Sequence, residues 1–184
     1  PRTTHLLDPD FAPRLADFAS RVAERYPWVR DFTPVNEPLT TARFSGLYGN
    51  WYPHARDTRS FLRALIVQTR ATTLAMRAIR AHIPDARLVQ TEDFGATASA
   101  PSLRYQATYE NHRRWLSLDL LFGRVTPSHP LYRHLVTSGV GEDTLDALVE
   151  RPTPPGLLGV NYYVTSDRYL DDRLRLYPAH MHGG

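Results

Sequence analysis

Apolar positions along the chain follow two different spacings, which predict alternating helices and strands. They recur every three to four residues, as on one face of a helix, over 11–23, 61–79 and 103–122. Shorter apolar runs lie between these stretches, at 28–35 and 87–91, and after the last of them, at 156–163. Strands separated by helices are typical of βαβ units, so we expect an α/β fold with a parallel sheet.

Capping and helix-breaking residues predict where these elements begin and end. The first helix should begin at Asp8 and Pro9, bury Phe18 with its apolar face and stop before Pro27. The second helix should begin at 57 or 58 and end near 82, and short helices are expected over 131–137 and 142–151. Loops are expected over 39–56, 95–102 and most of 164–184, whereas 156–163 should be a buried strand.

The length of the chain limits which parallel fold it can form. It has 184 residues, 42% hydrophobic and 22% charged, which suits one domain over 1–184. A complete (β/α)₈ TIM barrel needs roughly 250 residues, with a floor of about 200. If the motifs indicate such a barrel, we therefore expect a partial one, with parallel strands alternating with helices.

Composition excludes several classes of function. There is no cysteine, so disulfides and thiolate metal sites are excluded. All 22 basic residues are arginine, and they are scattered among acidic residues, so neither the net charge of +3 nor their spacing favours a nucleic-acid partner. His180 and His182 do not suggest a functional metal site, and no phosphate-binding loop indicates a cofactor. With no apolar run of about 20 residues and no signal-like start, we expect a cytoplasmic protein without a membrane partner.

Acidic residues follow two neighbouring strands of the predicted sheet. Glu37 stands after the first strand beside Asn36, and Glu92 and Asp93 end the second. Neighbouring strands lie about 4.8 Å apart, so Glu37 and Glu92 could approach each other as a carboxylate pair. Such a pair suits general acid–base chemistry, although acids at strand ends also simply bind nearby arginines.

Aromatic and amide side chains provide the other candidates. Asn161, Tyr162 and Tyr163 end the third strand, where a phenol could hold a carboxylate. One of the two tyrosines should point toward the site and the other into the helix layer. Tyr48 and Trp51 lie in the loop after Glu37 and could stack against a ring or cover an edge of the core.

Three stretches together resemble glycoside hydrolase family 1, the β-glucosidase family. Thr33-Pro34-Val35-Asn36-Glu37-Pro38 is similar to the family's strand-end signature, and Gly46-Leu47-Tyr48-Gly49 through Pro53 resembles the loop after it. Leu158-Gly159-Val160-Asn161-Tyr162-Tyr163 resembles the sixth-strand motif. The order and spacing agree along nearly all of the chain, which implies strands four to six of a (β/α)₈ barrel.

The resemblance implies a role for each matching residue. Glu37 would be the general acid/base of a retaining β-glycosidase, and Asn36 would bind the sugar's 2-hydroxyl. Tyr163 would orient the nucleophile, with Asn161 nearby in the site. The family's Glu-Asn-Gly nucleophile motif does not occur, since Glu110-Asn111 is followed by His112 inside a predicted helix.

The absence of this motif leaves two interpretations of function. In the first, the chain hydrolyses β-glycosides, with Glu92, Asp93 or a partner chain supplying the second carboxylate. Because three parallel strands leave open edges, we expect a homo-oligomer. In the second, the chain is a non-catalytic carbohydrate-binding or structural remnant of a glycosidase barrel. The sequence does not specify the sugar, the linkage or the oligomer number.

Overall fold

The computed structural model describes residues 5–182, and its elements alternate between helices and strands. In chain order they are α1 (Phe11–Arg25), β1 (Asp31–Phe32), α2 (Pro38–Ala42), a π-helical segment (Arg43–Leu47), α3 (Thr58–His82), β2 (Arg87–Asp93), β3 (Thr97–Ser99), α4 (Arg104–Leu121), α5 (Tyr132–Thr137), α6 (Glu142–Glu150), β4 (Leu157–Asn161) and β5 (Arg168–Leu170). Short 3₁₀ turns span Pro101–Leu103, Leu174–Leu176 and Ala179–Met181.

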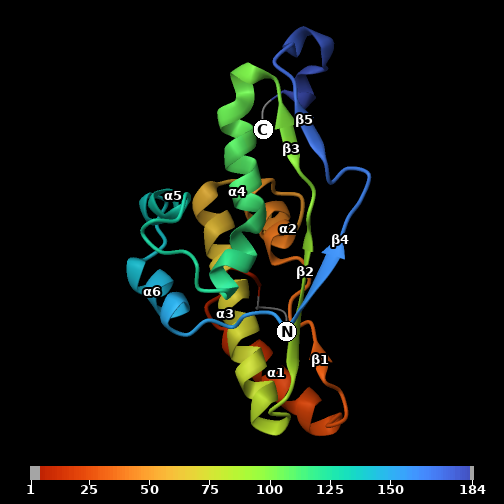
Figure 1. The fold of residues 1–184 in the computed structure, drawn as a ribbon, viewed down its shortest axis with the longest axis vertical. Helices are drawn as coiled ribbons and strands as arrows, with labels where there is room; N and C mark the ends of the chain where they lie inside the picture. Colours follow the sequence, from red (N-terminus) through yellow and green to blue (C-terminus); the bar gives the residue numbers. More distant parts are fainter. Residues whose placement is uncertain (1–4, 183–184) are drawn as a thin grey trace.

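The central sheet is parallel and open, as expected for part of a (β/α)₈ barrel. Its strand order is β1-β2-β4, so β2 lies between the other two, and β3 and β5 form a separate parallel pair. Figure 1 shows the long helices α1, α3 and α4 on one side of β2, with β4 on its other side. The register places Asp93 beside Asn161, which brings the ends of β2 and β4 together.

Helix α3 joins two apolar clusters that form the core. The larger cluster packs α3 against α2, α4, α5 and α6 through Leu39, Phe61, Leu62, Leu65, Leu116, Leu120, Leu135 and Leu145. The second packs α3 against α1 and β2 through Ala19, Ala23, Met76, Ile79 and Leu88. The residues of α1 that face α3 are small. Phe18 is instead 59% exposed, so its predicted burial was wrong. Helix α1 also begins later than predicted, because the Asp8 carboxylate accepts the Asp10 amide in a turn before it.

Much of the predicted loop at 39–56 is helical. Leu39 and Ala42 pack into the core beside Phe61, and this burial favours helix over the irregular structure that glycines and aromatics suggested. The predicted loops at 95–102 and 164–184 also contain paired strands, β3 and β5, whose long-range pairing leaves no local signal. Conversely, the strand predicted at 28–35 shrinks to β1, since Pro34 cannot donate to a ladder.

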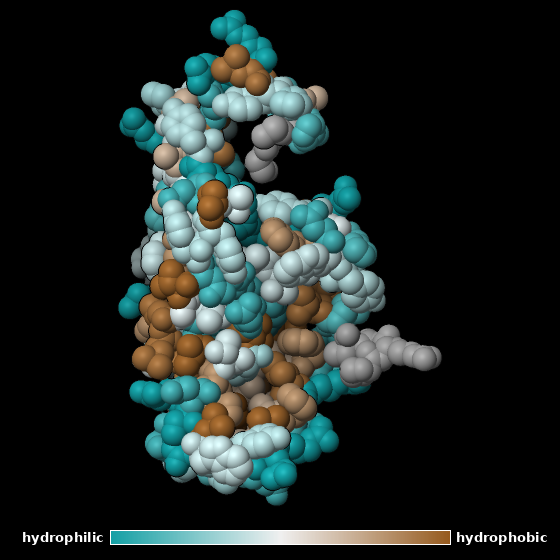
Figure 2. All heavy atoms as spheres, turned by 90° about the vertical axis from the view of Figure 1, so that its right-hand side faces the viewer, coloured by the Kyte–Doolittle hydropathy of each residue, from teal (hydrophilic) through white to brown (hydrophobic). Residues whose placement is uncertain are grey.

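Strand β4 is exposed, which overturns the expectation of a buried strand. Val160 is 67% exposed, and Leu157 and Leu158 are also exposed. Figure 2 views the molecule from this side and shows apolar side chains gathered around its middle. Within residues 5–182, β4 pairs only with β2, and no further layer covers its outer face. No helix among the described residues is long and apolar enough to cross a membrane.

Gly46 marks a close approach that tests the packing of the π-helical segment on α3. A Cβ at this position would lie 2.6 Å from the Phe61 Cα, a backbone atom that cannot rotate away. We expect Gly46→Ala to lower the free energy of unfolding by about 1–3 kcal/mol in urea denaturation. Gly156→Ala is the control, because its nearest neighbour would be the Arg87 Cβ at 3.4 Å. Equal stability of the two variants would contradict this packing.

Candidate active site

Glu37 occupies a constrained turn between β1 and α2. Its φ of +44° lies in the left-handed region, which is rare for residues other than glycine and clusters at functional sites. The Glu37 amide donates to the Thr91 carbonyl at 3.2 Å, and its carbonyl accepts from the Thr41 amide at 2.9 Å. These bonds hold the turn between the end of β2 and the first turn of α2.

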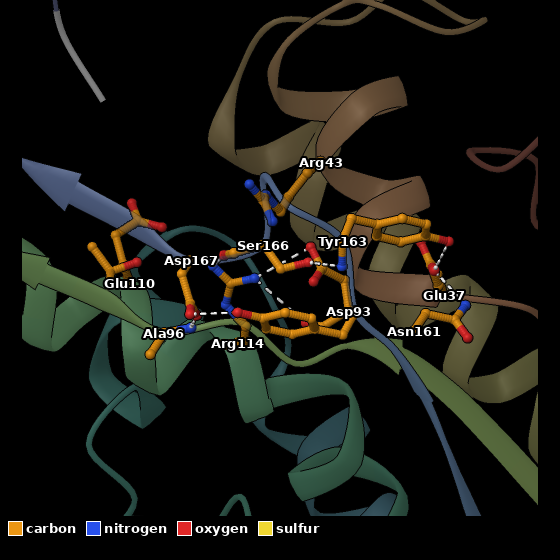
Figure 3. A network of polar contacts seen from close by, with 12 residues as sticks. Glu37, Arg43, Asp93, Ala96, Glu110, Arg114, Asn161, Tyr163, Ser166 and Asp167 are labelled. Carbon is orange, nitrogen blue, oxygen red and sulfur yellow. Dashed lines mark hydrogen bonds and ion pairs between the residues drawn. The ribbon is translucent and has the colours of Figure 1, made fainter.

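The Glu37 carboxylate meets two side chains from the end of β4 (Figure 3). The Asn161 side-chain amide donates to Oε1, and the Tyr163 hydroxyl donates to the same oxygen at 3.4 Å. Asn36 joins them, since its Oδ1 accepts from Thr91 Oγ1 at 2.8 Å and from Asn161 Nδ2 at 3.5 Å. The structure thus brings together four of the residues that the sequence singled out: Asn36, Glu37, Asn161 and Tyr163.

The two tyrosines after β4 have different partners. The negative charge of Glu37, followed by partial desolvation, raises the pKa of the Tyr163 phenol. One of the two tyrosines was expected to point into the helix layer, but Tyr162 does not. Its hydroxyl donates to Asp167 at 2.6 Å and its ring is exposed, because β4 has no helix on its outer side. Tyr163 therefore faces the carboxylate, and Tyr162 fixes the loop after β4.

Glu92 lies beneath the segment that carries Glu37. It is 0% exposed, and its Oε1 accepts from the Leu39 amide at 3.0 Å. Burial raises its pKa to about 7, and the charges of Glu37 and Asp93 add to this, while the Ser117 hydroxyl and the Leu39 amide oppose it. Among the described residues, neither Glu92 Oε2 nor Ser117 Oγ has a hydrogen bond of normal geometry. The Glu92 carboxyl is therefore closed off from solvent, and its bond to the Leu39 amide ties it to α2.

The aromatic candidates lie further along the chain. Two arginines donate to the Tyr48 hydroxyl, Arg43 at 3.3 Å and Arg113 at 3.4 Å. Burial raises the pKa of this phenol, but the two cations outweigh burial and leave the pKa below its usual value. Trp51 is half-exposed and packs edge-on against Phe44, with ring centres 4.9 Å apart. Trp51 thus presents an open aromatic surface, whereas the Tyr48 hydroxyl is occupied.

Sequence reasoning missed a buried arginine that braces the site. Arg114 on α4 donates to the Asp93 carboxylate at 3.3 Å and to the Ser166 carbonyl at 3.2 Å. The Ser166 hydroxyl in turn accepts from the Tyr163 amide at 2.8 Å. Arg114 thereby joins the end of β2 to the loop that carries Tyr163 (Figure 3). The Arg113-Arg114 pair on a predicted helix was visible in the sequence, but nothing there indicated which partners it would find.

Other features of the described chain lie apart from this cluster. A hollow between α3 and α6, lined by Arg70, Arg77 and Asp143 among others, includes none of the predicted site residues. Within the described residues, no group of three or more His, Asp or Glu side chains could hold a metal ion. The strand-end carboxylate cluster is therefore the candidate active site.

Comparisons with known proteins identify the class of this fold. No protein-family model matches the sequence, and no curated protein matches it at a significant level. Among solved structures, the described fold is similar to a family 1 β-glucosidase from Thermotoga maritima, with a TM-score of 0.76 and 20% identity over 90% of this chain and 38% of that one. The same kind of enzyme in complex with deoxynojirimycin gives a TM-score of 0.77 at 20% identity, again over 90% and 38%. Its cyclophellitol complex gives 0.73 at 20% identity, over 90% and 37%.

The fold and site thus define a partial (β/α)₈ barrel with a carboxylate at a strand end. More particularly, the fold is that of part of a family 1 glycoside hydrolase, which confirms at the level of the fold the resemblance found in the sequence. The chain spans about 38% of the length of the solved structures that it matches.

The raised pKa of Glu92 predicts how stability depends on pH. An acid whose pKa rises from 4.5 to about 7 on folding binds its proton more tightly in the folded state. Its contribution is therefore complete below about pH 4.5 and is lost as the pH rises through about 7. We expect the unfolding free energy of the wild type to decline over this range by up to about 3 kcal/mol relative to Glu92→Gln.

Urea denaturation at several pH values measures this difference. Glu24→Gln is the control, since Glu24 is an exposed acid on α1. The control should keep the decline with pH that Glu92→Gln loses. Parallel curves for the wild type and Glu92→Gln would contradict the raised pKa.

Proposed function

We propose that this chain forms the acid/base side of a β-glycoside hydrolase site that works with retention of configuration, with Glu37 as the general acid/base. The observation that carries the proposal is the shared contact of Asn161 and Tyr163 with Glu37 Oε1 at the end of the parallel strands. The fold match supports it, because the matched β-glucosidase structures hold deoxynojirimycin and cyclophellitol, both sugar-like ligands. The proposed substrate is therefore a small β-glycoside or oligosaccharide. The proposed location is the cytoplasm.

The contacts of Glu37 suit an acid that gives up one proton. Both donors contact Oε1, which leaves Oε2 as the oxygen that would pass a proton to the glycosidic oxygen as that bond to the sugar breaks and the second carboxylate bonds to the sugar carbon. In the second step a water would displace that carboxylate from the sugar and give its proton to Oε2. Asn36 and Asn161 would offer amides to sugar hydroxyls, and Tyr163 would orient the nucleophile. Trp51 would offer an aromatic surface for the ring, and Tyr48, like Trp51, packs near Phe44.

A retaining mechanism needs a second carboxylate about 5–5.5 Å from the first. Within the described residues, Glu92 and Asp93 stand at the neighbouring strand end, but the first is buried against Leu39 and the second is paired with Arg114. We therefore propose that the nucleophile comes from a second copy of the chain. The exposed strand β4 is the edge at which such a copy would pair.

Replacing the acid tests this function directly. We expect the wild type to hydrolyse aryl β-glucosides and Glu37→Gln to lose about 10²–10⁴-fold in turnover for a phenyl leaving group. The loss should be much smaller for dinitrophenyl, which departs without being protonated. Release of the phenol, followed by its absorbance, measures both rates.

Glu24→Gln provides the matched control, since it removes an exposed carboxylate of the same type. Equal rates for the wild type and Glu37→Gln would refute the assignment of Glu37. Absence of hydrolysis, together with calorimetric binding of deoxynojirimycin, would instead establish the non-catalytic carbohydrate-binding alternative.

The open edge predicts self-association. We expect the chain to scatter light as a dimer or larger species, because Leu158 and Val160 expose apolar surface on β4, a strand at the edge of the described sheet. Leu158→Lys should shift the species toward the monomer by placing a charge in the interface, whereas Arg21→Lys on α1 should leave the mass unchanged. A monomeric wild type would overturn this part of the proposal.

A further inference from the structure

The segment that carries Glu37 is fixed to the core by side chains from two elements. Gln68 of α3 donates to the Pro38 carbonyl at 3.0 Å, and Gln90 of β2 donates to the Val35 carbonyl at 3.1 Å. Glu92 accepts from the Leu39 amide at 3.0 Å. All three side chains are fully buried, so each bond is made away from water.

The Leu39 amide needs this acceptor because of its position in α2. It is the second residue of the helix, and the first amides of a helix have no carbonyl four residues earlier to bind. Pro38, the first residue, has no N–H. Leu39 is also buried, so an unpaired amide there would carry the cost of a desolvated donor. Glu92 Oε1 is the acceptor that the described structure provides.

The position of Glu37 depends on how its neighbours in the chain are held. A left-handed backbone costs a non-glycine residue free energy and persists only where its surroundings impose it. The bond from Leu39 to Glu92 holds the chain two residues after Glu37, and the bond to Thr91 holds Glu37 itself. If the first bond were lost, the turn could relax and the carboxylate could leave Asn161 and Tyr163.

We propose that Glu92 is a positioning residue whose buried carboxyl, by accepting the Leu39 amide, keeps Glu37 turned toward Asn161 and Tyr163. This assigns Glu92 a role that differs from the second catalytic carboxylate expected from the sequence. The catalytic significance of the role rests on the proposed function of Glu37. The contact itself is testable without any turnover.

Two substitutions of similar size separate the two properties of the Glu92 carboxyl, its ability to accept a hydrogen bond and its ability to ionise. Glu92→Gln keeps an oxygen that can accept the Leu39 amide, whereas Glu92→Met fills the space without one. We expect hydrogen exchange of the Leu39 amide, followed by NMR, to stay slow in the wild type and Glu92→Gln and to become about tenfold faster in Glu92→Met. Thr69→Val is the control, because it removes a buried hydroxyl of α3 that binds only the Leu65 carbonyl.

The titration of Tyr163 reports whether Glu37 has moved. Because the Glu37 charge raises the pKa of this phenol, that pKa should fall toward its ordinary value in Glu92→Met and stay raised in Glu92→Gln. Glu37→Gln serves as the reference for complete loss of the interaction. A residue that only stabilised the fold would leave this pKa unchanged in every variant that folds, and that result would overturn the proposal.

Turnover then separates positioning from catalysis. With an aryl β-glucoside, Glu92→Met should lower kcat more than it changes KM, and Glu92→Gln should restore most of the loss. If Glu92→Gln is as inactive as Glu92→Met while the Leu39 amide stays protected, Glu92 acts through its acid group and the proposal is wrong. If Glu92→Met does not fold, Glu92→Asp draws the acceptor back by one methylene and should give the same amide and Tyr163 effects.

Inactivity of every variant and of the wild type would refute the proposed hydrolase function alone. The exchange rate of Leu39 and the titration of Tyr163 would still decide the positioning role. Conversely, full activity in the wild type with exchange of the Leu39 amide still slow in Glu92→Met would refute the positioning role and leave the hydrolase proposal intact.

Discussion

The parallel pairing of β2 with its two neighbours is the constraint on which the site depends. Because the strands run in the same direction, their carboxyl ends meet at one edge, and the register that sets Asp93 beside Asn161 brings the β4 motif to Glu37. A slip of one residue would turn every side chain of β4 to the opposite face. The bond from the Glu37 amide to the Thr91 carbonyl ties the remaining segment to the same edge.

The polar groups beneath the site come at a cost in stability. Glu92, Gln68 and Gln90 are fully buried, and each has one side-chain oxygen without a partner among the described residues. Burying such atoms is unfavourable, and apolar residues at these positions would pack with less penalty. Their bonds to the backbone around Glu37 explain why they are nonetheless in place, since they fix a turn that the local sequence alone would not hold.

The sequence predicted the helices well, because α3 and α4 carry a long apolar period and Asp57 caps α3 through the Ser60 amide. Short motifs at strand ends also singled out Asn36, Glu37, Asn161 and Tyr163, and these side chains do lie together in the structure. The sequence did not predict α2, the pair formed by β3 and β5, or the exposure of β4, because each depends on contacts distant in the chain. The same reason explains Arg114, whose partners Asp93 and Ser166 lie on two separate elements.

The two sides of the site differ in their exposure to water. Glu37 is only 8% exposed although the sheet is open, since its carboxylate lies against Asn161 and Tyr163 and its backbone is bonded to Thr91 and to α2. Tyr163 and the apolar residues of β4 face solvent instead. Electrostatic stabilisation of a charged transition state is much stronger where water is excluded, so an acid held in place on one side is not sufficient for efficient catalysis. In the proposed assembly, the second copy that covers β4 would therefore supply both a carboxylate and low-polarity surroundings, and this joint requirement links the proposed chemistry to the proposed assembly.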